Sequence, residues 1–311
     1  MMPERRYYDL NRYFRSVFGC RVHKITLDAG FSCPNRDGTL SSGGCIYCNA
    51  RGSGTGAHAR GLSVTDQLLA GRQVMTRRFK AKKFIAYFQA YTNTYAPVDR
   101  LKALYDEALA VPDMVGIAVG TRPDCVDDAV LDLLASYAKQ HMVWLEIGVQ
   151  SALDRTLAII NRGHDTACTT SAVQAAVDRG LLVCGHIILG LPGESREEMV
   201  ETGRYIADLG MAGVKFHVLY VVRGTPLAAM SGNGDYRCME QQDYVDAVCD
   251  VLEVLPPTMV IQRLTGDPHP DELVAPLWTL DKRGTLEAIN DTLERRDSWQ
   301  GKHYKTLPGP G

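Results

Sequence analysis

Three cysteines near the start of the chain have the spacing of a metal site. Cys33 precedes Cys45 by eleven residues, and two more residues separate Cys45 from Cys48. A Cys-x2-Cys pair brings two thiolates to one metal through a tight turn, and the glycines at 43 and 44 let the backbone fold around that metal. The remaining six of the nine cysteines are scattered, so a disulfide framework is not expected.

Three thiolates suit two kinds of metal site. They can hold three irons of a [4Fe-4S] cluster and leave the fourth iron open. With His58 as a fourth ligand they can instead form a Cys3His zinc site. The spacing alone leaves both possibilities open.

Polar side chains also follow a series of apolar segments at the points where those segments end. In parallel α/β folds the carboxyl ends of the strands share one edge, where functional sites gather. One deep polar site is therefore expected there. The residues concerned are Gln89, Tyr91, Asn93, Tyr95, Arg122, Asp124, Glu146, Gln150, Ser151, His186, Lys215 and His217.

A regular alternation of strands and helices positions these residues. Because the strands recur at intervals of about 30 residues, the pattern predicts right-handed βαβ units and a parallel sheet. Strands are predicted at 22–27, 83–88, 114–119, 142–149, 181–189 and 213–222. Helices are predicted from Ser63 onward and at 97–110, 127–141, 166–179 and 195–209.

After Pro226 the rhythm changes to a long helix at 236–255, a strand at 260–264 and a closing helix at 283–296. We therefore expect three segments. They are a basic and aromatic N-terminal extension at 1–24, a barrel at 25–226, and a C-terminal extension at 227–311 that packs on the barrel.

Composition and charge exclude several classes of protein. The 311 residues are 45% hydrophobic and 23% charged, with a formal net charge of −2, which is typical of a globular protein and not of a uniformly basic one. No apolar stretch approaches the roughly 18 residues of a membrane span, and the N-terminus lacks the apolar centre of a secretory signal. A cytoplasmic protein without a membrane partner is expected.

Two local clusters are nevertheless basic. The N-terminal extension interleaves arginines with aromatic residues such as Tyr13 and Phe14, a combination that suits phosphate contacts and base stacking. A solvated helix face is the alternative interpretation. The second cluster, a candidate RNA contact, consists of Arg77, Arg78, Lys80, Lys82 and Lys83.

The cysteine loop carries a family resemblance. Residues 33–39, Cys-Pro-Asn-Arg-Asp-Gly-Thr, with 43–48, Gly-Gly-Cys-Ile-Tyr-Cys, resemble the bacterial YtqA/YhcC-like family of the radical S-adenosylmethionine (SAM) superfamily, a relative of the Elp3-type core. Further matches include Gly-Thr-Arg-Pro-Asp at 120–124 and the segment at 186–194, and the similarity runs from about Tyr8 to Gly301. The superfamily's common first gap is three residues, but Elp3-type relatives also have a longer one.

The resemblance implies a fold, two cofactors and a reaction. The fold is α/β, a partial (β/α)6 TIM-like barrel with an N-terminal extension and a C-terminal α/β extension. A [4Fe-4S] cluster binds SAM and cleaves it reductively, and the resulting 5'-deoxyadenosyl radical takes a hydrogen atom from the substrate. The protein supplies binding, orientation and exclusion of water.

It also implies roles for individual residues. Cys33, Cys45 and Cys48 would hold the cluster. The expected SAM contacts are Tyr47, Gln89, Ala90, Tyr91, Glu146, Gln150, Ser151, Ile188 and Gly190. The expected catalytic or substrate-facing residues are Asn93, Tyr95, Arg122, Asp124, His186, Lys215, His217 and Arg263.

The substrate expected from the resemblance is tRNA. YtqA-like proteins are associated with the conversion of 5-carboxymethylaminomethyluridine to 5-aminomethyluridine at the wobble position, and an arginine such as Arg122 or Arg263 suits a substrate carboxylate. A flavodoxin- or ferredoxin-like reductant is implied. A radical SAM enzyme for a small metabolite and a non-catalytic Cys3His zinc protein that binds RNA are the alternatives.

Overall fold

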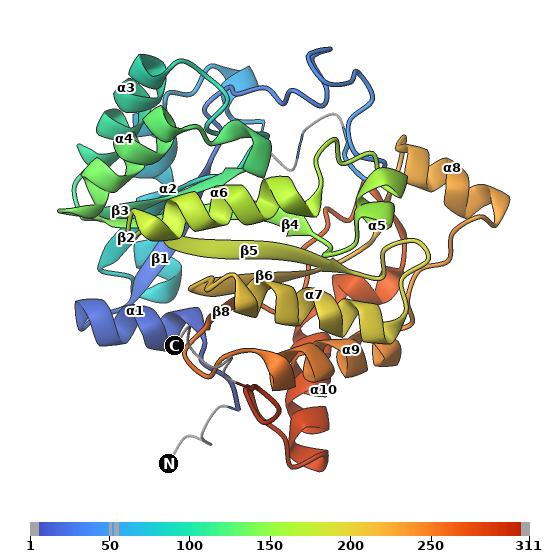
Figure 1. Cartoon of the computed structure of the whole chain (residues 1–311). Helices are drawn as coiled ribbons and strands as arrows, with labels where there is room; N and C mark the ends of the chain where they lie inside the picture. Colours follow the sequence, from blue (N-terminus) through green and yellow to red (C-terminus); the bar gives the residue numbers. More distant parts are fainter. Residues whose placement is uncertain (1–5, 50–51, 53–55, 306–311) are drawn as a thin grey trace, which may run out of the picture.

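The centre of the molecule is a curled, fully parallel sheet. The structure is a computed structural model that describes residues 6–49, 52 and 56–305. The strands follow the order β1-β2-β3-β4-β5-β6-β8 and form a half-barrel (Figure 1). Their bounds are Val22–Leu27 (β1), Lys83–Phe88 (β2), Met114–Thr121 (β3), Met142–Gln150 (β4), Leu182–Leu189 (β5), Gly213–Val218 (β6) and Val260–Arg263 (β8). The predicted α/β partial barrel is confirmed, with one strand added to the six expected.

Helices cover the outer face of this sheet (Figure 1). They are α2 (Val64–Phe79), α3 (Val98–Leu109), α4 (Asp128–Ala138), α6 (Thr166–Asp178), α7 (Arg196–Asp208) and α9 (Gln241–Val254). Helix α10 (Lys282–Arg295) packs on α9. Ser63 caps α2 as predicted, and its hydroxyl accepts the backbone N–H of Asp66 in a capping box. Among the described residues, no helix combines the length and apolarity needed to cross a membrane.

Side-chain alternation along each strand separates the core from the interior of the barrel. In β4, Leu145 and Ile147 belong to the apolar core under the helices, whereas Glu146 and Gly148 line an internal cavity. Successive side chains of a strand point to opposite faces. The inner face therefore becomes polar toward the carboxyl ends of the strands.

The N-terminal segment forms a helix that the sequence analysis did not predict. Helix α1 (Leu10–Phe18) begins at the cap Asp9 and contacts β1 and β8. Phe14 is only 2% exposed, and the Tyr13 ring meets Trp144 edge-on at 5.7 Å. Phe14 is therefore part of the core and is not available to stack on RNA bases, whereas the RNA contact of the N-terminal extension as a whole stays a prediction.

The C-terminal part departs from the predicted elements at two places. The strand expected at 213–222 divides into β6 and a short β7 (Val221–Val222), because the chain turns after Leu219 and pairs antiparallel with β9 (Leu273–Ala275). The strand expected at 260–264 is β8, which lies parallel to β6 and extends the main sheet.

Two short helices were also not predicted, α5 (Asp154–Ile159) and α8 (Pro226–Asn233). Thr225 caps α8 and Pro226 starts it, a combination that typically marks a helix start. Short 3-10 helices lie at His58–Arg60, Pro123–Cys125 and Leu277–Leu280. The division into segments 1–24, 25–226 and 227–311 stays a prediction, and residues 1–5 and 306–311 lie outside the described residues.

Candidate functional site

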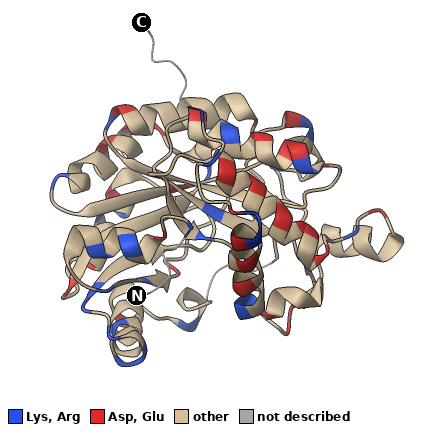
Figure 2. Cartoon of the chain, turned by 90° about the horizontal axis from the view of Figure 1, so that it is seen from below, with Lys and Arg blue, Asp and Glu red and all other residues tan. Residues whose placement is uncertain are grey.

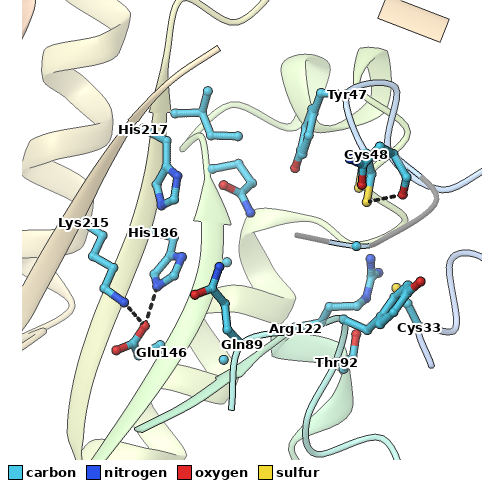
Figure 3. A pocket seen from close by; sticks show the side chains of 18 of the residues that line it. Cys33, Tyr47, Cys48, Gln89, Thr92, Arg122, Glu146, His186, Lys215 and His217 are labelled. Carbon is cyan, nitrogen blue, oxygen red and sulfur yellow. Dashed lines mark hydrogen bonds and ion pairs between the residues drawn. The ribbon is translucent and has the colours of Figure 1, made fainter. Parts of the chain in front are cut away.

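A cavity of about 440 Å³ opens at the carboxyl ends of the parallel strands (Figure 3). Its volume lies within the usual range for small-molecule sites. The three clustered cysteines line one half of it. The other half is lined by Glu146 of β4, His186 of β5, and Lys215 and His217 of β6. The polar strand ends thus converge as the sequence predicted.

The cysteine loop is folded tightly and anchored to the chain after α5. The backbone N–H of Cys48 donates to the carbonyl of Cys45 at 2.9 Å, and Gly44 before it has a φ of +71°, in the left-handed region. Asn161 donates to the Gly44 carbonyl at 2.7 Å, while Asn35 donates to the Asn161 carbonyl at 2.6 Å. These two hydrogen bonds fix the cysteine loop to the segment after α5 and so hold the thiols in place.

Three side chains donate hydrogen bonds to the thiols. Arg36 lies 3.3 Å from the sulfur of Cys48, and both Asn35 and Arg162 lie 3.6 Å from the sulfur of Cys45. Burial opposes ionisation of Cys45, but the charge and hydrogen bond of Arg162 overcome it and lower the pKa of the thiol. Such donors favour thiolate ligands and tune the metal that they hold.

Further buried donors near the thiols have no partner among the described residues. These atoms are the hydroxyl of Tyr47, Nη1 of Arg122 and Nε of Arg162. The other edge of Arg122 is bound by both carboxylate oxygens of Asp124, at 2.8 and 2.7 Å. Buried polar atoms in native proteins are rarely unpaired. A bound group beside the thiols would satisfy these donors.

Gly148 makes room for Arg162. A Cβ at Gly148 would lie 2.4 Å from Nη2 of Arg162 and 2.7 Å from Nε2 of Gln150. Arg162 donates to the Gly148 carbonyl at 2.8 Å, so its guanidinium lies directly against the strand. Only a residue without a side chain permits this approach.

We expect Gly148→Ala to destabilise the protein by about 1–3 kcal/mol, because the new methyl group must displace a buried guanidinium. Urea unfolding followed by circular dichroism measures the change. Gly232→Ala is the matched control: it lies in helix α8 and its added methyl meets nothing within 4 Å. Equal stability of Gly148→Ala and the wild type would contradict the tight contact.

In the other half of the cavity, a single carboxylate organises several cations. Glu146 is fully buried and bonds Lys24, Lys215 and His186, the last at 2.9 Å. Although burial opposes ionisation, Lys215 and Lys24 hold the pKa of Glu146 well below its ordinary value. Burial lowers the pKa of Lys215 to about 8, and its ammonium lies 4.0 Å from the centre of the Tyr87 ring.

His217 and Arg263 continue this group toward the edge of the sheet. The rings of His186 and His217 stack with centres 5.1 Å apart, and Nη2 of Arg263 lies 2.7 Å from Nδ1 of His217. Burial and the neighbouring cations keep the pKa of His217 well below its ordinary value, so its ring is neutral. Because a guanidinium only donates, Nδ1 accepts and the proton of His217 lies on Nε2.

Most of the predicted site residues meet in this cavity. Six of them do not line it. Four of these are buried elsewhere, namely Ala90, Asn93, Ser151 and Gly190, and the other two, Tyr95 and Asp124, line a separate surface cavity. Those that line it are Cys33, Cys45, Tyr47, Cys48, Gln89, Tyr91, Arg122, Glu146, Gln150, His186, Ile188, Lys215, His217 and Arg263.

His58 lies apart from the cavity. Its ring packs against Gly30, where a Cβ would be 2.3 Å from the ring nitrogen. His58 is not among the residues that line the cavity of the three thiols. The arrangement therefore does not support the Cys3His zinc site that the spacing left open.

The basic cluster of the second predicted RNA contact lies at the opposite end of the sheet. Arg77 and Arg78 are in the last turn of α2, and Lys83 begins β2, whose carboxyl end points to the cavity. The six residues of β2 span about 20 Å. Lys80 and Lys82 lie between these elements, and Figure 2 shows acidic positions interspersed with basic ones along the helices. These cations therefore cannot contact a group inside the cavity.

Four residues of the site escaped the sequence analysis. Arg162 follows Asn161 in a loop without a predicted function, and Asn35 and Arg36 were noted only as part of the cysteine motif. Lys24 is the last residue of the expected N-terminal extension at 1–24, for which no site residue was predicted. Its position on β1, two residues after the buried Val22, indicates that it points inward.

Comparisons with known proteins agree with this architecture. Residues 38–206 match the profile of the Radical SAM superfamily, and residues 211–295 match that of the Radical SAM C-terminal domain. Protein YtqA of Bacillus subtilis is 44% identical over 304 residues, which cover 98% of this chain and 94% of YtqA. Protein YhcC of Escherichia coli K12 is 44% identical over 262 residues, which cover 84% of each chain.

A solved structure shares the fold. The archaeal Elp3 of Methanocaldococcus infernus superposes with a TM-score of 0.70 at 17% identity. The match covers 90% of this chain and 64% of the Elp3 chain, so this chain spans less than two thirds of that protein. At this level of identity the similarity concerns the fold alone.

Proposed function

The chain belongs to the radical SAM superfamily, within the family that contains YtqA and YhcC, and from this premise we propose that it modifies the wobble uridine of tRNA in the cytoplasm. As a radical SAM enzyme it uses a [4Fe-4S] cluster and SAM as cofactors. The proposed reaction converts 5-carboxymethylaminomethyluridine to 5-aminomethyluridine. A flavodoxin- or ferredoxin-like protein is the proposed reductant.

The cysteine half of the cavity fits these cofactors. Cys33, Cys45 and Cys48 supply three thiolates, which is the set that leaves one iron of a [4Fe-4S] cluster open. The unpartnered donors of Tyr47, Arg122 and Arg162 surround the same space.

When bound, the cluster supplies the electron for reductive cleavage of SAM, which provides the oxidising radical for hydrogen abstraction. The chain's own residues hold the thiolates, orient SAM and exclude water. We propose Tyr47, Gln89, Tyr91, Gln150 and Ile188 as the SAM contacts, because these predicted residues line the cavity.

One observation carries the choice of substrate. The cavity joins the thiols to a half lined by Lys215 and Arg263. Glu146 there bonds both Lys215 and Lys24, while Arg263 contacts the ring of His217. The two other carboxylates of the lining, Asp267 and Glu272, bond Lys282 and Asn49. An excess of buried positive charge favours a substrate with an anionic end, and the modified uridine carries a carboxylate. To reach the cavity, the modified base must leave the base stack of the RNA, as it does in other enzymes that act on nucleobases.

The test is an anaerobic assay of cluster-loaded protein with SAM, a strong reductant and bulk tRNA from cells that lack this gene. We expect 5'-deoxyadenosine to form while 5-carboxymethylaminomethyluridine decreases and 5-aminomethyluridine increases by an equal amount, as measured by nucleoside mass spectrometry. Deoxyadenosine formation with unchanged tRNA nucleosides would reject the substrate and leave the enzyme class intact.

A further inference from the structure

We propose that the half of the cavity away from the thiols contains a carboxylate subsite formed by Lys215, His217 and Arg263. This inference rests on the proposed function, because it assigns a place to the charged end of the modified uridine. It also makes a separate claim, namely that these three side chains select a substrate by its terminal carboxylate.

Unpaired hydrogen-bond donors mark this subsite. Nε2 of His217 and Nε of Arg263 are buried without a partner among the described residues. The bond from Arg263 to Nδ1 places the proton of His217 on Nε2, so both atoms are donors. An unsatisfied buried donor costs about 1–3 kcal/mol, which a bound acceptor would recover.

The local charges favour an anion as that acceptor. The carboxylate of Glu146 is already shared by Lys24, Lys215 and His186, so it has little capacity to neutralise a third cation. Among the described residues, no carboxylate is bonded to Arg263, whose partner is the neutral ring of His217. A bound carboxylate would satisfy the donors and balance the charge of Arg263 at the same time.

The structure also distinguishes Arg263 from Arg122, the other arginine expected to suit a carboxylate. Asp124 occupies one full edge of the Arg122 guanidinium, and the remaining nitrogen lies beside the thiols. Arg263 ends β8, where the pairing with β6 shifts register between Val214 and Lys215. Such irregularities re-aim side chains, here toward the interior of the barrel.

The depth of the subsite argues for a side-chain carboxylate and against a backbone phosphate. Lys215 and His217 lie on the inner face of β6, within the barrel, and the side chain of Lys215 is only 8% exposed. A phosphate of an RNA strand is flanked by two sugars, and these would have to enter with it. The terminal carboxylate of a flipped base enters the cavity first, and the opening needs to be only as wide as the substituent that carries it.

The experiment measures which RNA the cluster-loaded protein prefers when no reductant is present. Three anticodon stem-loops, which carry 5-carboxymethylaminomethyluridine, 5-aminomethyluridine or uridine at the wobble position, are titrated by fluorescence anisotropy. We expect the wild type to bind the first at least about tenfold more tightly than the second, since this is the effect of one good charge-assisted hydrogen bond. In Arg263→Gln this preference should fall below about twofold.

Two further variants separate recognition from folding. Arg263→Lys keeps the positive charge but loses the planar guanidinium, which can donate two parallel hydrogen bonds to a carboxylate. An intermediate preference for the stem-loop with the carboxylate is therefore expected. Arg204→Gln alters an exposed arginine of α7 outside the cavity and should keep the wild-type preference. Circular dichroism verifies that each variant is folded. A preference that persists in folded Arg263→Gln would overturn the subsite.

Two small probes keep the subsite testable if the RNA proposal fails. N-methylglycine carries the same terminal carboxylate and amine as the modified uridine, and its binding is measured by calorimetry. Binding that disappears in Arg263→Gln supports the subsite even if no stem-loop binds. If neither the stem-loop preference nor this binding is seen, the subsite is rejected. Inorganic phosphate that binds more tightly at the same residues would overturn its assignment to a carboxylate.

Discussion

Replacing Cys45 with alanine is expected to abolish reductive SAM cleavage. The thiol of Cys45 is buried, faces the cavity and accepts hydrogen bonds from Asn35 and Arg162, so no neighbouring cysteine can take its place. Loss of partners that only contact a metal ligand already costs 10–100-fold, and we expect loss of the ligand itself to cost more than about 100-fold.

The measurement combines iron and sulfide content, the visible absorbance of the cluster, and 5'-deoxyadenosine formed anaerobically with SAM and reductant. Cys168→Ala is the matched control, because Cys168 lies on α6 and lines a different cavity. It should load iron and form deoxyadenosine as the wild type does. If Cys45→Ala matched the wild type in both respects, the assignment of the cysteine loop would be wrong.

The second large effect is expected on stability, from Glu146→Gln. The substitution keeps the shape of the side chain but leaves the ammonium groups of Lys24 and Lys215 without a counter-charge inside the barrel. Removing one partner of a buried ion pair typically costs about 3–5 kcal/mol. Urea unfolding at neutral pH measures this loss.

The exposed pair of Arg283 and Glu287 on α10 provides the control. Glu287→Gln should cost less than about 1 kcal/mol, because solvent screens exposed ion pairs. A second comparison adds Lys215→Met to Glu146→Gln, which removes one of the two uncompensated charges and should recover part of the lost stability. Equal costs for Glu146→Gln and Glu287→Gln would show that Glu146 does not organise these cations.

The pH dependence of unfolding gives an independent check on Glu146. Its pKa in the folded protein lies well below the ordinary glutamate value, so its contribution to stability is present above pH 4.5 and is lost as the pH falls through the lowered pKa. His186 acts in the same direction, because its pKa is lowered to about 4 and the unfolded chain binds its proton first. When the pH is lowered from 4.5, the free energy of unfolding should therefore decrease less in Glu146→Gln than in the wild type.

The proposed reaction makes use of the two halves of the cavity. The thiols and their arginines occupy one side, and the group around Glu146 occupies the other, so a substrate anchored by its charged end extends toward the cofactors. Both halves contain buried donors without a partner among the described residues, which a bound group would satisfy. Their separation within one enclosed space suits radical chemistry, which requires that water be excluded.

The local sequence determined the secondary structure and the chemistry of the cysteine loop. Strands β1 and β2 have the bounds that alternation and apolar runs predicted, and Ser63 caps the following helix as expected. The turn from Cys45 to Cys48 depends on residues that are neighbours in the chain. Such features follow from nearest-neighbour sterics and hydrogen bonding, which a sequence displays directly.

Only the tertiary structure decided which polar side chains meet. Lys24 reaches Glu146 across 122 residues, Lys215 reaches it across 69, and Arg162 reaches Cys45 across 117. Alternation shows that a lysine on β1 lies on the inner face, but it does not show which residue lies opposite. That depends on strand order, register and the curl of the sheet, which follow from the packing of all the helices together.

The same reason explains two features that the sequence did not reveal, the packing of α1 and the place of β8 in the sheet. Helix α1 was interpreted as a basic, aromatic extension because its aromatic residues carry no sign of what they pack against, and β8 was separated from the barrel by its distance along the chain. Tyr13 contacts Trp144, and β8 pairs with β6, only in the folded and curled sheet. Burial is a property of the folded whole, since apolar surface is removed from water by whichever segment can reach it.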